Sequence, residues 1–311
     1  MRDPETALIS RLRFRHLELI QSLGETGSLH KTAKAMNLSQ PAISKALGEI
    51  ESSFGFQLFR RSPAGVAVTP RGQAILEGAT LLLNSLRHVS RAALHAERHV
   101  VLRIGVSPFI GVTLVPRLLS TLRKHGDEVS VSLREGGGPQ SFDLFRNGEL
   151  DALLVTGPSD LVYPQPAVAI TMKPLFEEGL SVIAAVDHPL ASRRRLSWRD
   201  LLEERWILPP APAHVDEAIR GAFVSQGLVP PRPWIESVHP LTNIELVAAG
   251  HGIGAVPSSL VRIARERGLI SELRIEPKVH LPSVRFIFRS VEADSPAIRA
   301  LTQALEARGL L

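Results

Sequence analysis

Apolar residues recur at helical spacing near the start of the chain. From Phe14 to Leu23 they stand three or four positions apart, which predicts an amphipathic helix ending at Gly24. Ser28 suits the N-cap of a short second helix, and Asn37 suits a tight connection because asparagine tolerates a left-handed backbone. A third helix is expected to open at Gln40.

The third helix has two distinct faces. Ser39 fits its N-cap, Pro41 fits the first turn, and an apolar stripe runs from Ile43 to Phe54. The opposite face offers small hydrogen-bonding groups and a cation, which suit the major groove of DNA, and it carries Gln40, Ser44 and Lys45. The pattern favours a helix-turn-helix over the alternative, a helical hairpin with a polar exposed face.

Two short apolar segments follow, at 56–59 and 66–68, and they predict a pair of strands. The turn between them, RRSPAG, holds Arg60 and Arg61. A basic loop beside a recognition helix forms a wing whose arginines reach phosphates or the minor groove.

A heptad pattern follows the wing. Ile75, Ala79, Leu82, Leu86, Val89 and Ala93 are separated by steps of four and three, within a proline-free run over 72–98. This repeat predicts a long helix that pairs with a copy of itself, and the alternative is a helix packed on the core of its own domain.

From Val100 the pattern changes to strands alternating with helices, which predicts two α/β units with parallel sheets. The first unit is expected to hold strands 100–107, 129–133 and 152–155 with helices 113–122 and 140–147. The second, beginning near Leu175, is expected to hold strands 181–186, 206–208, 234–238 and 252–256 with helices 215–226 and 241–249. Crossings at 162–167 and 275–282 separate the units, and a last strand (283–289) and helix (296–309) return to the first.

Open α/β sheets place ligands beyond the carboxyl ends of their strands, so a cleft between the units is the expected effector site. The candidate side chains and backbones at those strand ends are Ser107, Phe109, Gly137, Gly138, Thr156, Pro210, Ala211, His239 and Thr242. Ser107 and Thr113 are expected near a helix N-terminus, which suits an anionic or polyhydroxy metabolite. A plain turn at 136–138 and a structural role for His239 are the alternatives. The arginine run at 191–198 is interpreted as a solvated loop rather than a second nucleic-acid site.

The surplus of positive charge lies in the first third of the chain. Residues 1–98 carry 13 Lys plus Arg against 8 Asp plus Glu, whereas 99–311 carry 23 of each. A basic module on a neutral body favours a polyanion partner. The chain has 44% hydrophobic residues, no cysteine, no secretory signal and no apolar run of the roughly 18 residues that span a bilayer, so we expect a cytoplasmic protein without thiol chemistry.

Several motifs in fixed order resemble the DNA-binding domain of the LysR-type transcriptional regulators. They are the GSL before the second helix, the run from Ala33 to Lys45, LFRRS at 58–62 and TPRG at 69–72. Weaker likenesses lie at 104–107, 147–155 and 247–257. Lys45 stands where the family more often has arginine and Arg60 where an acidic residue is common, which changes the expected operator.

The resemblance implies an N-terminal winged helix-turn-helix, a long linker helix and an α/β two-lobe, periplasmic-binding-protein-like (type 2) effector domain. The expected division is 1–71, 72–98, lobe 1 at 99–167 with 281–311, and lobe 2 at 168–280. It also implies a homotetramer that binds double-stranded operator DNA and a small-molecule effector, with RNA polymerase as a partner of an activator. The expected DNA-binding residues are Ser28, Lys31, Ser39, Gln40, Pro41, Ser44, Lys45, Arg60, Arg61 and Thr69.

An enzyme is the main alternative. The chain lacks the G-x-S-x-G, Walker, H-E-x-x-H and complete G-x-G-x-x-G motifs. His95 and His99 are four apart but have no nearby acidic pair to complete a metal site. We therefore expect no catalytic residue, metal or cofactor. The remaining alternatives are an α/β enzyme with an accessory DNA-binding domain and an architectural DNA protein without a ligand.

Overall fold

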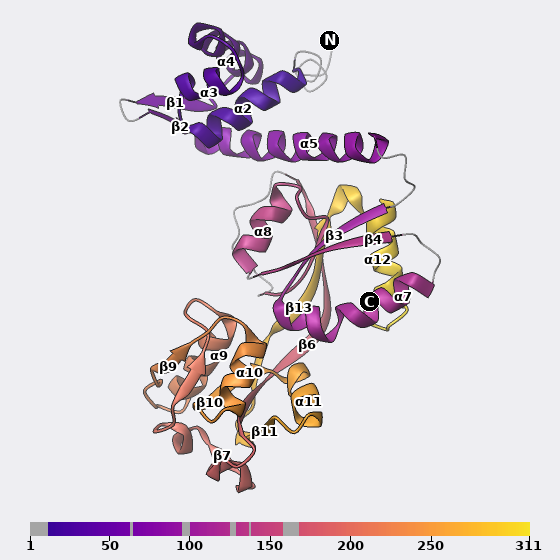
Figure 1. Ribbon diagram of the computed structural model, residues 1–311. Helices are drawn as coiled ribbons and strands as arrows, with labels where there is room; N and C mark the ends of the chain where they lie inside the picture. The colour runs from indigo at the N-terminus through magenta and orange to yellow at the C-terminus, as the bar shows by residue number, and fades with distance from the viewer. Residues whose placement is uncertain (1–11, 63–64, 95–99, 125–128, 137, 158–167) are drawn as a thin grey trace.

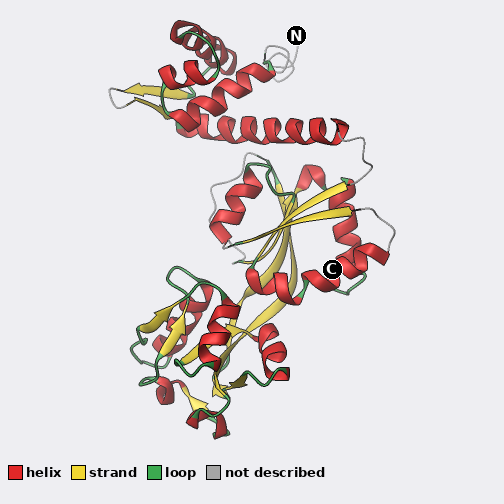
Figure 2. Cartoon of the chain, viewed as in Figure 1, coloured by secondary structure: helices red, strands yellow, loops and turns green. Residues whose placement is uncertain are grey.

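The computed structural model describes residues 12–62, 65–94, 100–124, 129–136, 138–157 and 168–311. A small helical domain stands at the N-terminal end, a long helix follows it, and a two-lobed α/β module makes up the rest (Figure 1). Figure 2 shows that helices dominate the first part and that strands form the centre of each lobe. Among the described helices, none is long and apolar enough to cross a membrane.

The N-terminal domain packs three helices against a two-stranded wing. Its elements are α2 (Phe14–Thr26), α3 (Leu29–Ala35), α4 (Gln40–Phe54), β1 (Phe59–Ser62) and β2 (Gly65–Val68). As expected, Ser28 and Ser39 cap α3 and α4, and Asn37 has a positive φ of 54°. Ile43, Leu47 and Ile50 bury the apolar stripe of α4.

Two expectations for this domain are wrong. The first helix continues past Gly24 to Thr26, and Gly24 is a packing position within it, since a Cβ there would lie 2.7 Å from Leu76 Cδ2 of the next long helix. The first wing strand begins at Phe59, so Arg60 and Arg61 lie within β1 and not in the turn. The residues before Phe59 are held against α4, since Glu51 Oε1 accepts the backbone N–H of Leu58 over 2.8 Å.

The long helix α5 (Pro70–Leu94) has 25 residues and begins two residues before the expected boundary. Its first seam residues, Ile75 and Ala79, pack into the N-terminal core, as the alternative reading of the heptad proposed. Leu82 and Leu86 are exposed. Residues 95–99, which include His95 and His99, lie outside the described residues.

The α/β module is built on one nine-stranded sheet, β4-β3-β5-β13-β6-β10-β8-β9, with β11 beside β6. Lobe 1 contains β3 (Val100–Val106), β4 (Val129–Glu135) and β5 (Ala152–Thr156), with α6 (Pro108–Thr113), α7 (Val115–Lys124), α8 (Gly138–Arg146) and α12 (Pro296–Glu306). Lobe 2 contains β8 (Trp206–Leu208), β9 (Pro233–Glu236), β10 (Ile253–Pro257) and β11 (Ile270–Glu272), with α9 (His214–Ser225), α10 (Pro240–Ala248) and α11 (Ser258–Glu266). A small sheet pairs β7 (Leu196–Ser197) with β12 (Ile275–Glu276), and short 3-10 helices lie at Pro189–Ser192, Trp198–Leu201 and Ser290–Glu292.

Two long strands join the lobes. β6 (Ile170–Ala185) pairs antiparallel with β13 (Val279–Arg289) from Leu180↔Val279 to Ile170↔Arg289, and both continue from one lobe into the other. The expected crossing at 162–167 lies outside the described residues, and the one at 275–282 is largely strand rather than loop. Pairing satisfies the backbone groups of the connection, and an irregularity between Leu281 and Val284 marks a local break in the register.

The helix expected over 113–122 is α7, which begins at Val115, and a separate short helix, α6, precedes it and ends at Thr113. Pro116 lies in the first turn of α7, where its missing N–H is tolerated and where it cannot continue the preceding helix. One apolar core contains residues of both lobes, and α6 of lobe 1 contacts α11 of lobe 2. The lobes are therefore packed together as well as strand-linked.

Candidate DNA-binding and effector-binding sites

The DNA-binding candidates gather on α3, α4 and the wing. Ser28 Oγ accepts the N–H of Lys31 over 3.4 Å, and Ser39 Oγ accepts the N–H of Ala42 over 3.3 Å. These two serine side chains therefore cap the first turns of α3 and α4. The exposed candidates around them are Lys31, Gln40, Pro41 and Lys45.

The wing is tied directly to α4. Arg61 Nη2 donates a hydrogen bond to Ser44 Oγ over 2.9 Å, and both residues are candidates from the sequence. Side chains alternate along a strand, so the neighbouring Arg60, which is also exposed, points away from that contact. Arg61 thus joins the two surfaces, and Arg60 is the wing cation free of α4.

Thr69 has a structural role. Its hydroxyl donates to Gln57 O and accepts from Gly72 N, both over 2.9 Å, so it caps α5 against the wing. Gly72 is buried beneath it, and a Cβ there would overlap the backbone carbonyl of Leu58. The TPRG sequence is explained by this close approach, and the Thr69 hydroxyl has already given its one hydrogen to Gln57 O, so it has none to donate to a phosphate. Sequence reasoning missed Glu51, whose carboxylate fixes the start of the wing.

On the lobe 1 side of the expected cleft, Ser107 and Thr156 lie together. Ser107 Oγ accepts the N–H of Thr156 over 3.3 Å, so the ends of β3 and β5 are joined. Phe109 is only 4% exposed and belongs to the core shared by the lobes, so it offers no surface in this conformation. Thr113 is the last residue of α6 and precedes the start of α7 by two residues, and its hydroxyl is engaged within α6, because it donates to Phe109 O over 2.8 Å.

On the lobe 2 side, His239 and Thr242 are exposed at the start of α10. His239 Nε2 lies 3.8 Å from Glu135 Oε2, which is at the end of β4 in lobe 1. This approach joins α10 of lobe 2 to the end of β4 in lobe 1. Glu135 gave no signal in the sequence, because nothing local distinguishes it from other carboxylates.

The remaining cleft candidates are less informative. Pro210 and Ala211 follow β8, where Pro210 is partly buried and Ala211 is exposed. Gly138 is the first residue of α8, and Gly137 lies outside the described residues. Asn243, missed by sequence reasoning, is 3% exposed and donates to Ser237 O over 3.2 Å.

A buried carboxylate lies where β6 passes between the lobes. Glu178 is 3% exposed, and burial raises its pKa above the ordinary value of 4.5. The backbone N–H of Ser259, 3.0 Å from Glu178 Oε1, partly opposes that rise. Among the described residues, no group of three or more His, Asp or Glu side chains is placed to hold a metal ion.

The long helix contacts lobe 1 of its own chain through polar groups. Arg146 of α8 forms an ion pair with Glu77 of α5, and both side chains are largely buried. Gln73 also donates to Glu77 Oε1, over 3.0 Å, and Asn84 donates to the carbonyl of Asn147. Lobe 1 is thus physically linked to the helix that carries the N-terminal domain.

Comparison with known proteins supplies two family matches. Residues 14–73 match the bacterial regulatory helix-turn-helix domain of the lysR family, and residues 95–309 match the LysR substrate binding domain. The regulator GbpR of Azospirillum brasilense is 26% identical over 303 residues, which cover 96% of this chain and 87% of GbpR. The regulator MetR of Escherichia coli K12 is 26% identical over 259 residues, 83% of this chain and 79% of MetR.

Solved structures share the whole arrangement. A full-length OxyR from Pseudomonas aeruginosa is similar with a TM-score of 0.63 at 23% identity, covering 95% of each chain. This likeness extends from the N-terminal helices through both lobes, so the fold is common to the two chains.

Proposed function

Because the chain belongs to the LysR family of bacterial transcriptional regulators, we propose that it binds an operator through α3, α4 and the wing and responds to a metabolite held between its lobes. It is a DNA-binding transcriptional regulator with an effector-binding domain, and not an enzyme. A cytoplasmic location is part of the proposal, as is contact with RNA polymerase if the output is activation.

In the proposed DNA complex, α4 lies in the major groove and the wing lies beside it. Gln40, Ser44 and Lys45 face the base edges, and Arg60 contacts the phosphate backbone. Ser28 and Ser39 stand at helix N-termini, where backbone N–H groups suit phosphate oxygens. The support is the exposure of Gln40, Lys45 and Arg60 together with the surplus positive charge of the first 98 residues.

The effector is proposed to bind where lobe 1 and lobe 2 face each other. The observation that carries this proposal is the 3.8 Å approach of His239 to Glu135 across the gap. Ser107 and Thr156 border the same gap with polar groups, and Thr242 borders it from α10. An anionic or polyhydroxy metabolite matches this lining of hydroxyls, an imidazole and a helix start.

Transmission to DNA is proposed to pass through α5. A change at the gap moves lobe 1, and lobe 1 holds α5 through Arg146 and Glu77. Two copies of α5 are proposed to pair through Leu82 and Leu86, so that this movement re-spaces two recognition helices on DNA. Regulators of this family are typically tetrameric, and we propose a dimer of dimers here.

The test uses the full chain. Anionic and polyhydroxy metabolites are screened by thermal shift, and compounds that raise the melting temperature are then tested for a change in DNA footprint or bend. His239→Ala and Thr242→Val are expected to abolish the response, whereas His251→Ala, at an exposed histidine beyond α10, leaves it intact. An equal response in all three variants, or effector binding without any change on DNA, contradicts the proposal.

A further inference from the structure

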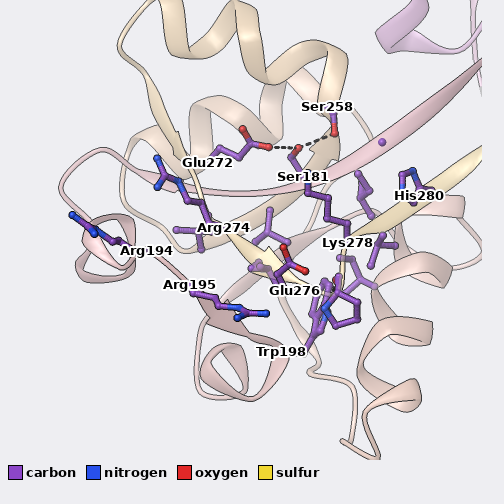
Figure 3. Close-up of a pocket in the computed structure, with 18 residues that line it drawn as sticks. Ser181, Arg194, Arg195, Trp198, Ser258, Glu272, Arg274, Glu276, Lys278 and His280 are labelled. Carbon is purple, nitrogen blue, oxygen red and sulfur yellow. Dashed lines mark hydrogen bonds between the residues drawn. The ribbon is translucent and has the colours of Figure 1, made fainter.

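Lobe 2 contains a cavity of about 550 Å³, which is in the size range of small-molecule sites. Its walls come from β6, β12 and the start of β13, from the segment Arg194–Trp198, and from Ser258 at the start of α11 (Figure 3). None of the described cleft candidates lines it. The cavity is therefore separate from the gap between the lobes.

The floor of the cavity is apolar. It is formed by the buried side chains of Leu180, Val182, Trp198, Ile219, Leu273 and Ile275. Trp198 is 2% exposed, and its indole N–H donates to Pro277 O over 3.1 Å. With that donor satisfied, these six side chains offer no free polar group, and the floor therefore favours an apolar body.

The rim is cationic. Four cationic side chains line the cavity, namely Arg194, Arg195, Arg274 and Lys278. Only two carboxylates, Glu272 and Glu276, are among its lining residues. Glu272 is already engaged, because it accepts the Ser181 hydroxyl over 2.7 Å and lies 3.6 Å from Arg265.

These four cations have no carboxylate within 4.0 Å among the described residues. The adjacent Arg193 behaves differently, since it pairs with Asp200 over 2.9 Å. The arginine run that the sequence indicated as a solvated loop thus divides in two. Arg193 stabilises the segment, while Arg194 and Arg195 are left at the mouth of the cavity.

One end of the cavity is polar, and its hydroxyl groups are held in place by hydrogen bonds. Ser181 is 7% exposed and lies 2.8 Å from Ser258 Oγ, and Figure 3 shows the chain of hydrogen bonds from Ser258 through Ser181 to Glu272. Gly179 makes room for this chain, since a Cβ there would lie 2.6 Å from Ser258 Oγ. The polar end is therefore ordered by the fold itself.

We propose that this cavity is a second small-molecule site, which takes an organic anion with an apolar body. The carboxylate, sulfonate or phosphate group is held at the rim by Arg195 and Lys278, and the ring or chain lies on the floor beside Trp198. The cavity is walled by the same two strands that join the lobes, so its occupant stiffens them. The site stands independently of an effector in the gap.

The test uses the full chain and 8-anilinonaphthalene-1-sulfonate, an aromatic anion, as the probe. In protein labelled with 5-fluorotryptophan, the ¹⁹F resonance of Trp198 is expected to shift on titration, while that of Trp234 on β9 does not. Trp198→Phe assigns the resonance. A shift confined to Trp234, or no shift at all, overturns the proposal.

Charge reversal at the rim supplies the second measurement. Arg195→Glu with Lys278→Glu is expected to weaken probe binding about tenfold or more, as loss of charge-assisted bonds requires. Arg199→Glu, at an exposed position directly after the segment Arg194–Trp198 that does not line the cavity, is the matched control. The uncharged N-phenyl-1-naphthylamine is expected to bind more weakly than the anion.

Two further variants keep the result decisive. If the double reversal lowers the melting temperature, Arg195→Gln with Lys278→Gln replaces it, and retained probe affinity there overturns the proposal. His239→Ala is expected to leave probe binding unchanged, because it lies in the gap. The experiment contains no DNA, so its outcome is separate from that of the proposed effector response.

Discussion

The guanidinium of Arg61 on β1 donates a hydrogen bond to the hydroxyl of Ser44 on α4, over 2.9 Å. The sequence assigned these residues separate roles, with Ser44 reading bases and Arg61 contacting the backbone. The bond makes them one unit, so that the wing and α4 hold these two side chains in a fixed relation.

The first prediction follows from this bond. Ser44→Ala is expected to relax sequence preference, and Arg61→Met is expected to weaken binding to all DNA and lower the salt dependence. Because the side chains are in contact, the double variant loses less affinity than the two single losses combined, with a coupling of about 0.5–1 kcal/mol. Titrations of each variant with operator DNA at several salt concentrations measure both the salt dependence and the coupling energy.

Arg60→Met is the matched control, because Arg60 carries the same charge on the same strand without contact to α4. It is expected to lower the salt dependence and to show no coupling to Ser44→Ala. Additive losses for Ser44 and Arg61 would contradict the prediction.

The second prediction concerns the start of α5. Gly72→Ala forces a methyl group into the carbonyl of Leu58 and is expected to lower the free energy of unfolding of the N-terminal domain by about 3 kcal/mol. Gly78→Ala in the same helix meets nothing within 4 Å, and it is expected to raise stability by about 0.5–1 kcal/mol. Urea denaturation followed by circular dichroism compares them, and equal effects would rule out the close approach.

The third prediction concerns pH. Burial raises the pKa of Glu178 above 4.5, so the folded protein binds this proton more tightly than the unfolded chain does. The resulting stabilisation is fully present below 4.5 and is lost as pH rises through the folded pKa. Unfolding of the wild type and of Glu178→Gln is measured at a series of pH values. The wild type is expected to lose stability relative to the variant as pH rises, and a constant difference contradicts this.

The fourth prediction concerns the exposed side of α5. Leu82 and Leu86 are 55% and 38% exposed, and both are expected to be covered by a second copy of the helix. Leu82→Glu with Leu86→Glu is expected to shift the protein to smaller species in light scattering, because paired helices would bury the carboxylates. Ser85→Glu, exposed on the same helix, is the control. An unchanged molar mass for the double variant would place the interface elsewhere.

Much of the fold could be predicted because its signals are local. The cap at Ser39, the left-handed Asn37 and the apolar stripe of α4 each depend on residues a few positions apart, and the structure has all three. Gly24 misled the prediction because its reason for being glycine is Leu76, far along the chain.

The sites were harder to predict, because their partners are distant in sequence. The approach of His239 to Glu135 and the bond between Arg61 and Ser44 join separate elements, and neither spacing forms a motif. The cavity in lobe 2 combines residues from 179 to 280, so its apolar floor and cationic rim are invisible until the chain is folded.

The order of strands in the large sheet has a consequence for biosynthesis. β13 lies between β5 and β6 at the centre of the sheet, yet it is the last strand of the chain. A nascent chain on the ribosome therefore has both halves of the sheet without the strand that joins them, while α4 and the wing have long since emerged. The N-terminal domain can fold early in translation, but the large sheet becomes complete only after β13 has emerged.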